Sequence, residues 1–149
     1  MRTIVWMRIL IELKNSFGEI QYIGEKAFSC CDSLTDIEFK GNLKQIEDCA
    51  FEFCGSLVQI KLPEGLERIG KCTFYSCENL RSVELPESLV DIGNNAFYSC
   101  PNLQKVYYPK DKKAWKEVVV GIGNEDLQSA KMHFYCNSFF YRWHWKNEG

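Results

Sequence analysis

Apolar residues recur along this chain in columns, with a fixed period of 23 residues. The columns hold, in chain order, isoleucine, phenylalanine, cysteine, leucine and a β-branched aliphatic residue. Their members are Ile23, Ile46, Ile69 and Ile92; Phe28, Phe51, Phe74 and Phe97; Cys31, Cys54, Cys77 and Cys100; Leu34, Leu57, Leu80 and Leu103; and Ile37, Ile60, Val83 and Val106. Such self-similarity indicates a solenoid, in which each repeat contacts its neighbours and the columns stack into one core.

Each repeat contains one clear strand signal. In Val83-Glu84-Leu85 the alternation predicts a short strand with Val83 and Leu85 pointing inward and Glu84 pointing outward. Pro86 ends this strand, because proline cannot donate a hydrogen bond to a ladder. Since all copies have the same length, we expect parallel strands with like side chains stacked over like, about 4.8 Å apart.

The remainder of the repeat is shorter and more irregular. A second extended piece is expected at residues 90–92, followed by a turn in which Gly93 allows positive φ. The equivalent residue in the second copy is Glu47, so positive φ is not obligatory at this position. Residues 95–100 are predicted to form a single helical turn, too short for a full α-helix. The fold class is therefore an α/β repeat solenoid with short parallel strands and short helical turns.

The two ends of the array depart from the period. Residues 1–22 are expected to form an atypical first rung, because a terminal repeat must cover the open end of the core. Residues 23–109 hold four full repeats, and residues 110–136 are predicted to form a C-terminal cap. Residues 137–149 are rich in aromatic residues and fit no repeat.

The expected cap has recognisable elements. A helical pattern at residues 111–117 places Trp115 inward, and residues 118–120 are a strand candidate. Asn124 is expected to cap a short helix at residues 125–130. Alternation around Met132 then predicts a final strand.

The segment I-G-N-N-A-F-Y-S-C-P-N-L-Q-K-V and its three sister copies resemble the leucine-rich repeats of the BspA-like bacterial surface-protein family. The resemblance covers residues 20–109 and extends toward Cys136. It implies a curved leucine-rich-repeat solenoid with a role in adhesion or protein binding, at the cell surface or secreted, and it does not imply catalysis.

Composition and charge argue against several classes of protein. The chain has 149 residues, a hydrophobic fraction of 46% and a formal net charge of −2. Its 18 basic and 20 acidic residues are interspersed without a basic stripe, so we expect no nucleic-acid partner. No apolar run reaches the ~20 residues of a membrane span. Arg8 interrupts the apolar N-terminus, which does not fit a signal peptide, although a fragment of an exported protein remains compatible.

Eight cysteines raise the question of metal binding or disulfides. The period itself explains the spacing of Cys49 and Cys54, and of Cys72 and Cys77, so we expect buried thiols that pack as small hydrophobes with a weak donor. A structural zinc site and a disulfide between Cys49 and Cys72 are the alternatives. We expect no cofactor and no metal.

Neither histidine, His133 or His144, has a sequence neighbourhood that suggests a catalytic base. His133 is expected to be an exposed strand residue. Gly121 and Gly123 alone are too little for a phosphate-binding loop. We therefore expect no enzymatic activity.

Two surfaces are candidates for a protein partner. The first is the outward row Glu38, Lys61, Glu84 and Tyr107, flanked by Asp36, Gln59, Ser82 and Lys105. The second is the pair Tyr75 and Tyr98 beside the phenylalanine column. A charge ladder that only faces solvent explains the first surface equally well, and mutual stacking of the rings explains the second. The sequence favours a non-catalytic protein-binding or adhesion module, with a structural spacer of a larger surface protein as the alternative. It does not indicate an oligomeric state.

Overall fold

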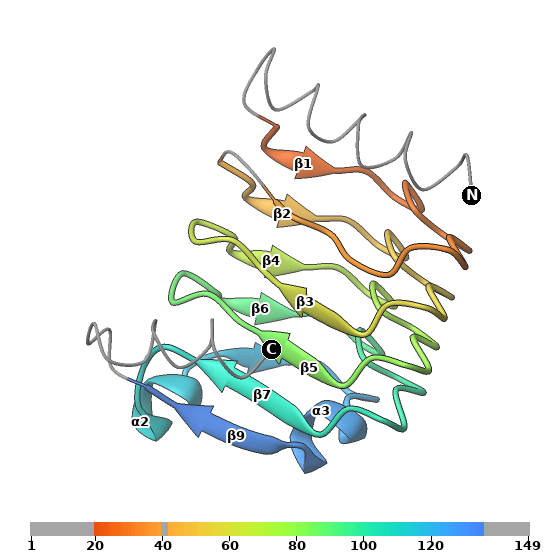
Figure 1. Ribbon diagram of the computed structural model, residues 1–149. Coiled ribbons are helices and arrows are strands. Elements are labelled where there is room, and N and C mark those ends of the chain that lie inside the picture. The colour runs from red at the N-terminus through yellow and green to blue at the C-terminus, as the bar shows by residue number, and fades with distance from the viewer. Residues whose placement is uncertain (1–19, 40–41, 136–149) are drawn as a thin grey trace.

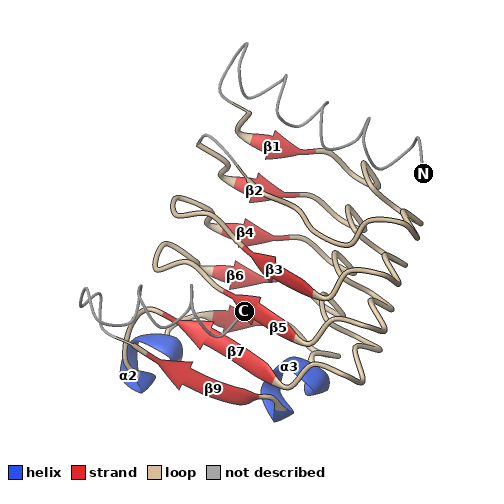
Figure 2. Cartoon of the chain, in the orientation of Figure 1, coloured by secondary structure: helices blue, strands red, loops and turns tan. Residues whose placement is uncertain are grey.

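The computed structural model describes residues 20–39 and 42–135, which form two parallel sheets along a stack of rungs (Figure 1). Sheet A has, in this order, β1 (Tyr22–Ile23), β2 (Gln45–Ile46), β4 (Arg68–Ile69), β6 (Asp91–Ile92) and β8 (Val119–Val120). Sheet B has β3 (Gln59–Lys61), β5 (Ser82–Glu84), β7 (Lys105–Tyr108) and β9 (Lys131–Phe134). Turns and loops connect these short strands (Figure 2). The α/β repeat solenoid predicted from the period is confirmed.

The strand register also agrees with the prediction. In sheet B, Val83 lies between Ile60 and Val106 and all three are buried. In sheet A the isoleucine column is stacked in the same way, with Ile69 between Ile46 and Ile92. Like residues therefore lie over like, because each rung has the same length. Most of the expected first rung, at residues 1–19, and the tail at 137–149 lie outside the described residues.

The phenylalanine column is a continuous stack of rings. Phe74 is fully buried between Phe51 and Phe97, with ring centroids 5.5 and 5.1 Å away. Phe28 extends the stack beyond Phe51 at 5.1 Å and is only partly buried. Offset aromatic pairs at such distances contribute about 0.5–1.5 kcal/mol beyond their buried area. The predicted position of Phe74 is confirmed.

The third side of each rung, expected to be a helical turn, consists of tight turns with two left-handed residues. The left-handed positions are Lys26 and Cys30, Cys49 and Phe53, Cys72 and Ser76, and Asn95 and Ser99. The amides between and beside them donate to the next rung, as from Phe74 N to Ala96 O at 2.7 Å and from Ser76 N to Tyr98 O at 2.9 Å. These bonds between rungs alternate with local ones such as Tyr75 N to Cys72 O at 3.2 Å. Together they hold a conformation that costs about 1–2 kcal/mol per non-glycine residue.

Gly93 does not use the positive φ that glycine allows, since the left-handed residue is Asn95, two positions later. Its role is to let the backbone of the preceding rung come close. A Cβ added to Gly93 would lie 2.6 Å from the backbone nitrogen of Lys71 in the preceding rung, and one added to Gly70 would meet Asp48 N at the same distance. Glycine therefore lets neighbouring rungs pack closely where sheet A ends and the turns begin.

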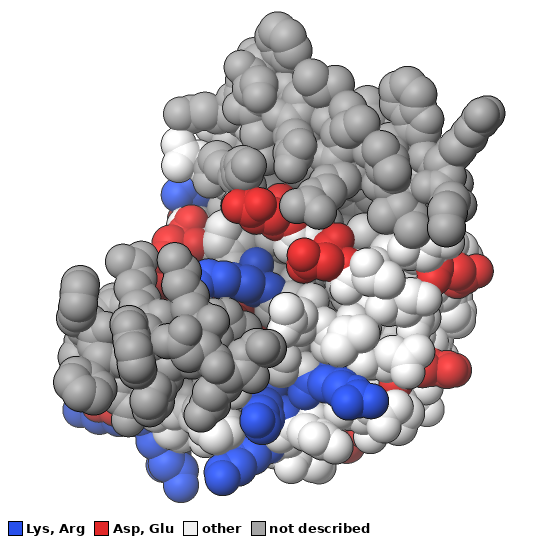
Figure 3. All heavy atoms as spheres, in the orientation of Figure 1, with Lys and Arg blue, Asp and Glu red and all other residues white. Residues whose placement is uncertain are grey.

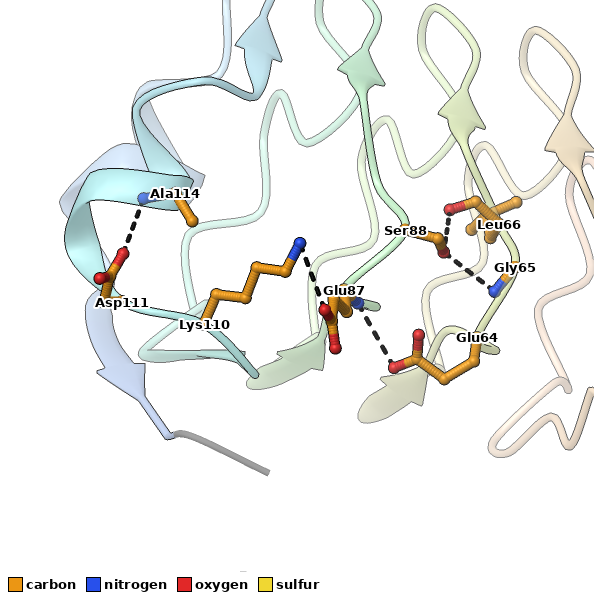
Figure 4. Close-up of polar contacts among 8 residues, drawn as sticks. All are labelled: Glu64, Gly65, Leu66, Glu87, Ser88, Lys110, Asp111 and Ala114. Atoms are coloured by element: carbon orange, nitrogen blue, oxygen red, sulfur yellow. Dashed lines mark hydrogen bonds and ion pairs between the residues drawn. The ribbon is translucent and has the colours of Figure 1, made fainter. Parts of the chain in front are cut away.

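Polar contacts connect successive rungs along the loops between the sheets (Figure 4). The Ser88 hydroxyl accepts a hydrogen bond from Gly65 N at 2.9 Å and donates one to Leu66 O at 2.8 Å. Glu87 N donates to Glu64 Oε1 at 3.3 Å, and the Glu87 carboxylate pairs with Lys110 Nζ at 3.3 Å. These contacts satisfy loop groups that the short strands leave unpaired.

Two short helices flank the last rung (Figure 1). Helix α2 (Lys112–Trp115) is capped by Asp111, whose carboxylate accepts from Ala114 N at 2.8 Å. Trp115 packs edge-on against Tyr108 with ring centroids 5.3 Å apart, as its predicted inward position requires. Helix α3 is Glu125–Ser129.

Asn124 occupies the N-cap position of α3, but its side chain does not cap the helix. Its Oδ1 accepts from Phe97 N at 2.9 Å, and its Nδ2 donates to Gly93 O and Gly121 O at 3.0 and 2.8 Å. In the preceding rung the equivalent amide, Phe74 N, donates to a main-chain carbonyl of the next rung. The Asn124 side chain thus takes the place of a further rung and closes this end of the stack.

Candidate partner-binding surface

The outer face of sheet B brings together three of the four residues predicted to form one row. Lys61, Glu84 and Tyr107 lie opposite one another on β3, β5 and β7, and β9 continues the row with His133. Glu38, the fourth predicted residue, is exposed in a segment that is not a strand. The described row is therefore shifted by one rung toward the C-terminal end.

The N-terminal end of this row, on β3 and β5, is an ion pair. Lys61 Nζ lies 2.9 Å from Glu84 Oε1, which also accepts a hydrogen bond from the Tyr135 hydroxyl at 3.1 Å. The Glu84 side chain is only 13% exposed, whereas that of Lys61 is 60% exposed. The carboxylate is thus held in place by two donors, and the Lys61 stem remains open to a partner.

An aromatic stack follows the ion pair on the C-terminal side. The rings of Tyr107 and His133 are nearly parallel, with centroids 4.9 Å apart. His133 was expected to be exposed, but it is half-buried, and its Nε2 has no hydrogen-bond partner among the described residues. Burial lowers the pKa of His133 below 6.5, and the nearby Lys131 and Lys105 lower it further. The sequence did not reveal this pair because the step from Tyr107 to His133 is 26 residues rather than 23.

Charges are unevenly distributed over this face. Figure 3 shows basic side chains gathered over the lower rungs and acidic side chains over the upper ones. Lys105 and Lys131 are exposed at the beginning of β7 and β9, and Asp36 and Glu38 are exposed at the opposite end. The flanking Gln59 and Ser82 lie in the same row as Lys105.

The second predicted surface is an aromatic ladder on the turn side. Tyr75 and Tyr98 stack with centroids 5.3 Å apart, and Phe53 meets Tyr75 edge-on at 5.6 Å. Phe53 and Tyr98 are 43% and 45% exposed. The sequence did not indicate Phe53, because its column otherwise holds cysteine and serine. Since Tyr75 has neighbouring rings on both sides, the ladder stabilises itself.

The cysteine column is packed as expected for small hydrophobes. Cys54, Cys77 and Cys100 are fully buried, and each thiol donates to a phenylalanine carbonyl of the preceding rung at 3.2–3.3 Å. Burial raises the pKa of Cys54 and of Cys100 to about 12. Within residues 20–39 and 42–135 every cysteine is a free thiol, and no three His, Cys, Asp or Glu side chains are placed to hold a metal ion.

The described part of the chain also holds no helix with the length and apolar character needed to cross a bilayer. The histidine that the structure describes, His133, packs on a ring rather than beside a nucleophile. The described residues of sheet B form an extended face of four neighbouring parallel strands.

Comparisons with solved structures agree with this geometry. A leucine-rich repeat protein from Bacteroides ovatus has 37% sequence identity and a TM-score of 0.62, over 76% of this chain and 28% of that protein. A leucine rich cell surface protein from Faecalibacterium prausnitzii has 32% identity and a TM-score of 0.63, over 64% and 25%. A leucine rich repeat protein of T. pallidum has 28% identity and a TM-score of 0.58, over 78% and 70%. The chain spans about a quarter of the length of the first two proteins.

No curated protein matches this chain. The sequence model of the BspA type leucine rich repeat region matches residues 10–119 in six copies, which is well over half of the chain. The repeat columns, the two parallel ladders and this match lead to one conclusion: the chain belongs to the BspA type leucine rich repeat family.

Proposed function

We propose that this chain is a non-catalytic protein-binding module whose partner docks on the outer face of sheet B. Leucine-rich repeats generally act as scaffolds for protein interactions, and solenoids use their extended faces for this purpose. The observation that carries the proposal is the row from Lys61 to His133 across four neighbouring strands. Its ion pair and ring stack hold the row in one arrangement before any partner arrives, which reduces the entropy lost on binding.

A structural spacer within a larger surface protein is the second candidate function. It is favoured by the lengths of the similar proteins from Bacteroides ovatus and Faecalibacterium prausnitzii, of which this chain covers 28% and 25%. The second of these is described as a cell surface protein, which supports a location at the cell surface for this chain. A spacer would have no partner on the row.

The test begins with a partner captured on the immobilised chain and then titrated against purified variants. Lys61→Glu places an acidic side chain beside Glu84, so the two carboxylates repel and the charge at the β3 end of the row changes sign. We expect this variant to lose affinity by at least tenfold, because a like-charge contact within an interface costs several kcal/mol. The loss should be larger at low salt, since exposed charges are screened as salt rises.

The matched control is Tyr98→Ala, which alters the aromatic ladder and leaves sheet B unchanged. Thermal unfolding of both variants separates a loss of affinity from a loss of fold. If Tyr98→Ala abolishes binding while Lys61→Glu binds normally, the partner uses the turn side and the proposal for sheet B is wrong. If no protein is retained on the chain at all, the spacer function is the better account.

A further inference from the structure

Three basic side chains gather where the strands of sheet B begin. Arg81 directly precedes β5, Lys105 is the first residue of β7, and Lys131 is the first residue of β9. Lys105 and Lys131 are paired in register, and the Arg81 carbonyl accepts from Lys105 N at 3.2 Å. All three side chains are exposed, and Figure 3 shows this end of the face covered by Lys and Arg. We call Arg81, Lys105 and Lys131 the basic cluster.

The basic cluster has no carboxylate of its own. Within the described residues Arg81, Lys105 and Lys131 form no ion pair, whereas Lys61 is paired with Glu84 at 2.9 Å. Like charges on adjacent strands repel one another. Two of the three charges also act on His133, whose pKa is lowered first by burial and then by Lys131 and Lys105. The basic cluster is thus a concentration of positive charge, and a bound anion would reduce the repulsion between its side chains.

The surroundings of the cluster limit the kind of anion. Adjacent strands lie about 4.8 Å apart, so three successive strand starts form a row only about 10 Å long. The acidic Asp36 and Glu38 stand at the other end of the same face, and the chain carries a net charge of −2. A long polyanion would meet these carboxylates, whereas a short acidic segment would not. Beside the cluster, the stacked rings of Tyr107 and His133 offer flat apolar area of the kind that peptide segments contact.

We propose that the basic cluster binds a short acidic segment of a protein partner, with carboxylates of the segment lying against Arg81, Lys105 and Lys131. This inference rests on the proposed protein-binding function of sheet B and specifies the chemistry of the partner. The acidic segment crosses the strand starts, and the remainder of the partner extends over the row toward Lys61. The acidic upper rungs repel the opposite placement and give the complex one orientation.

The test uses a fluorescent five-residue peptide of alternating Glu and Ser residues, about 17 Å long when extended, titrated by anisotropy against the whole chain at low salt. A peptide with Gln in place of every Glu is the uncharged control. The double variant Lys105→Gln/Lys131→Gln removes two charges from the cluster. Its matched control is Lys112→Gln/Lys113→Gln, which removes two exposed charges from α2.

We expect the acidic peptide to bind the unaltered chain and the α2 control equally, and the cluster variant roughly fivefold to twentyfold more weakly. The Gln peptide should not bind measurably. Equal binding of the acidic peptide to the cluster variant and the α2 control would show general attraction to lysines and would overturn the proposal. The proposal also fails if the acidic peptide does not bind at all, or if a heparin fragment of similar length binds the cluster and the peptide does not.

These results are separable from the test of the proposed function. If a captured partner is lost on Lys61→Glu but binds the cluster variant normally, sheet B is the binding face and the acidic-segment inference is wrong. If the acidic peptide requires the cluster while the captured partner ignores Lys61→Glu, the cluster binds acidic segments and the assignment of that partner to the row is wrong.

Discussion

The thiol of Cys77 donates a hydrogen bond to the carbonyl oxygen of Phe51, one rung earlier, with an Sγ–O distance of 3.3 Å. The same contact joins Cys54 to Phe28 and Cys100 to Phe74. The cysteine column therefore does more than fill space. It satisfies the main-chain carbonyl of Phe28, Phe51 and Phe74, and so couples the cysteine column to the phenylalanine column.

Replacement of Cys77 by Ala should lower the free energy of unfolding by about 1–3 kcal/mol, because it removes buried volume and leaves the Phe51 carbonyl without its donor. Cys31→Ala is the matched control: Cys31 is only half-buried, and its thiol lies 3.8 Å from Ser29 O within its own rung. Urea denaturation of both variants provides the comparison. An equal effect at the two positions would mean that the contact between rungs contributes little.

Replacement of Phe74 by Ala should cost about 3–5 kcal/mol, the range for a large cavity in a well-packed core. Phe74 has rings stacked on both faces and no exposed surface, whereas Phe28 is partly buried with one described ring neighbour. Phe28→Ala should therefore cost less. A loss below about 1 kcal/mol for Phe74→Ala would contradict its central position, since surface substitutions stay below that value.

The stacked columns of side chains could be predicted because residues that are one period apart in the sequence lie over one another in neighbouring rungs. Each conserved spacing of Ile, Phe, Cys and Leu places one side chain over its counterpart, and the structure confirms this for Ile69 and Phe74. The strand at Val83 followed from alternation alone. Regular packing is thus readable from one sequence when four copies repeat it.

The turns and the surface were less accessible to prediction. Positive φ occurs at Asn95, and also at Cys72 and Phe53, which are residue types with no preference for the left-handed region. This conformation is imposed by hydrogen bonds between rungs and cannot be read from local propensity. Two contacts depend on how the cap packs on the last repeat, where the period no longer applies. They are the Tyr107–His133 ring stack and the hydrogen bond from Phe97 N to Asn124 Oδ1.

The buried thiols should resist alkylation in the folded protein. Burial raises the pKa of Cys54 and of Cys100 to about 12, so at pH 8 almost none of either thiol is present as the reactive thiolate. Cys30 is exposed and should react first. Iodoacetamide labelling followed by peptide mass spectrometry measures the order. Early labelling of Cys100 without unfolding would show that the last rung opens readily.

The stability of the fold should fall on mild acidification because of His133. Its pKa is lowered in the folded protein, mainly by burial and then by Lys131 and Lys105, whereas the unfolded side chain titrates near 6.5. As the pH falls below that value, the unfolded state binds a proton that the folded state does not yet bind, so the stability that is present above pH 6.5 is lost. His133→Gln removes this contribution. Thermal unfolding between pH 7.5 and 5 should show a smaller decrease of Tm for the variant, and equal decreases would assign the effect to other groups.

The last prediction concerns the closure of the stack by Asn124, which is almost completely buried. Its side chain accepts from Phe97 N and donates to two carbonyls, at 2.8–3.0 Å. Asn124→Ala would leave Phe97 N and Gly121 O without these partners, while Gly93 O would keep its hydrogen bond from Ala96 N. The cost is about 1–3 kcal/mol for each group that loses its partner and that water cannot reach. We expect a total loss of roughly 2–5 kcal/mol in urea denaturation, with hydrogen exchange fastest at the Phe97 amide.

Asn102→Ala is the matched control for this residue. The Asn102 Nδ2 also donates to a carbonyl of the preceding rung, Glu78 O, at 2.7 Å, but this contact is exposed. Water can replace the lost donor there, so the loss should stay within about 0.5 kcal/mol. If Asn124→Ala were no more harmful than Asn102→Ala, water would enter the last rung freely, and the apolar contacts of α2 and α3 would have to close the core without the Asn124 side chain.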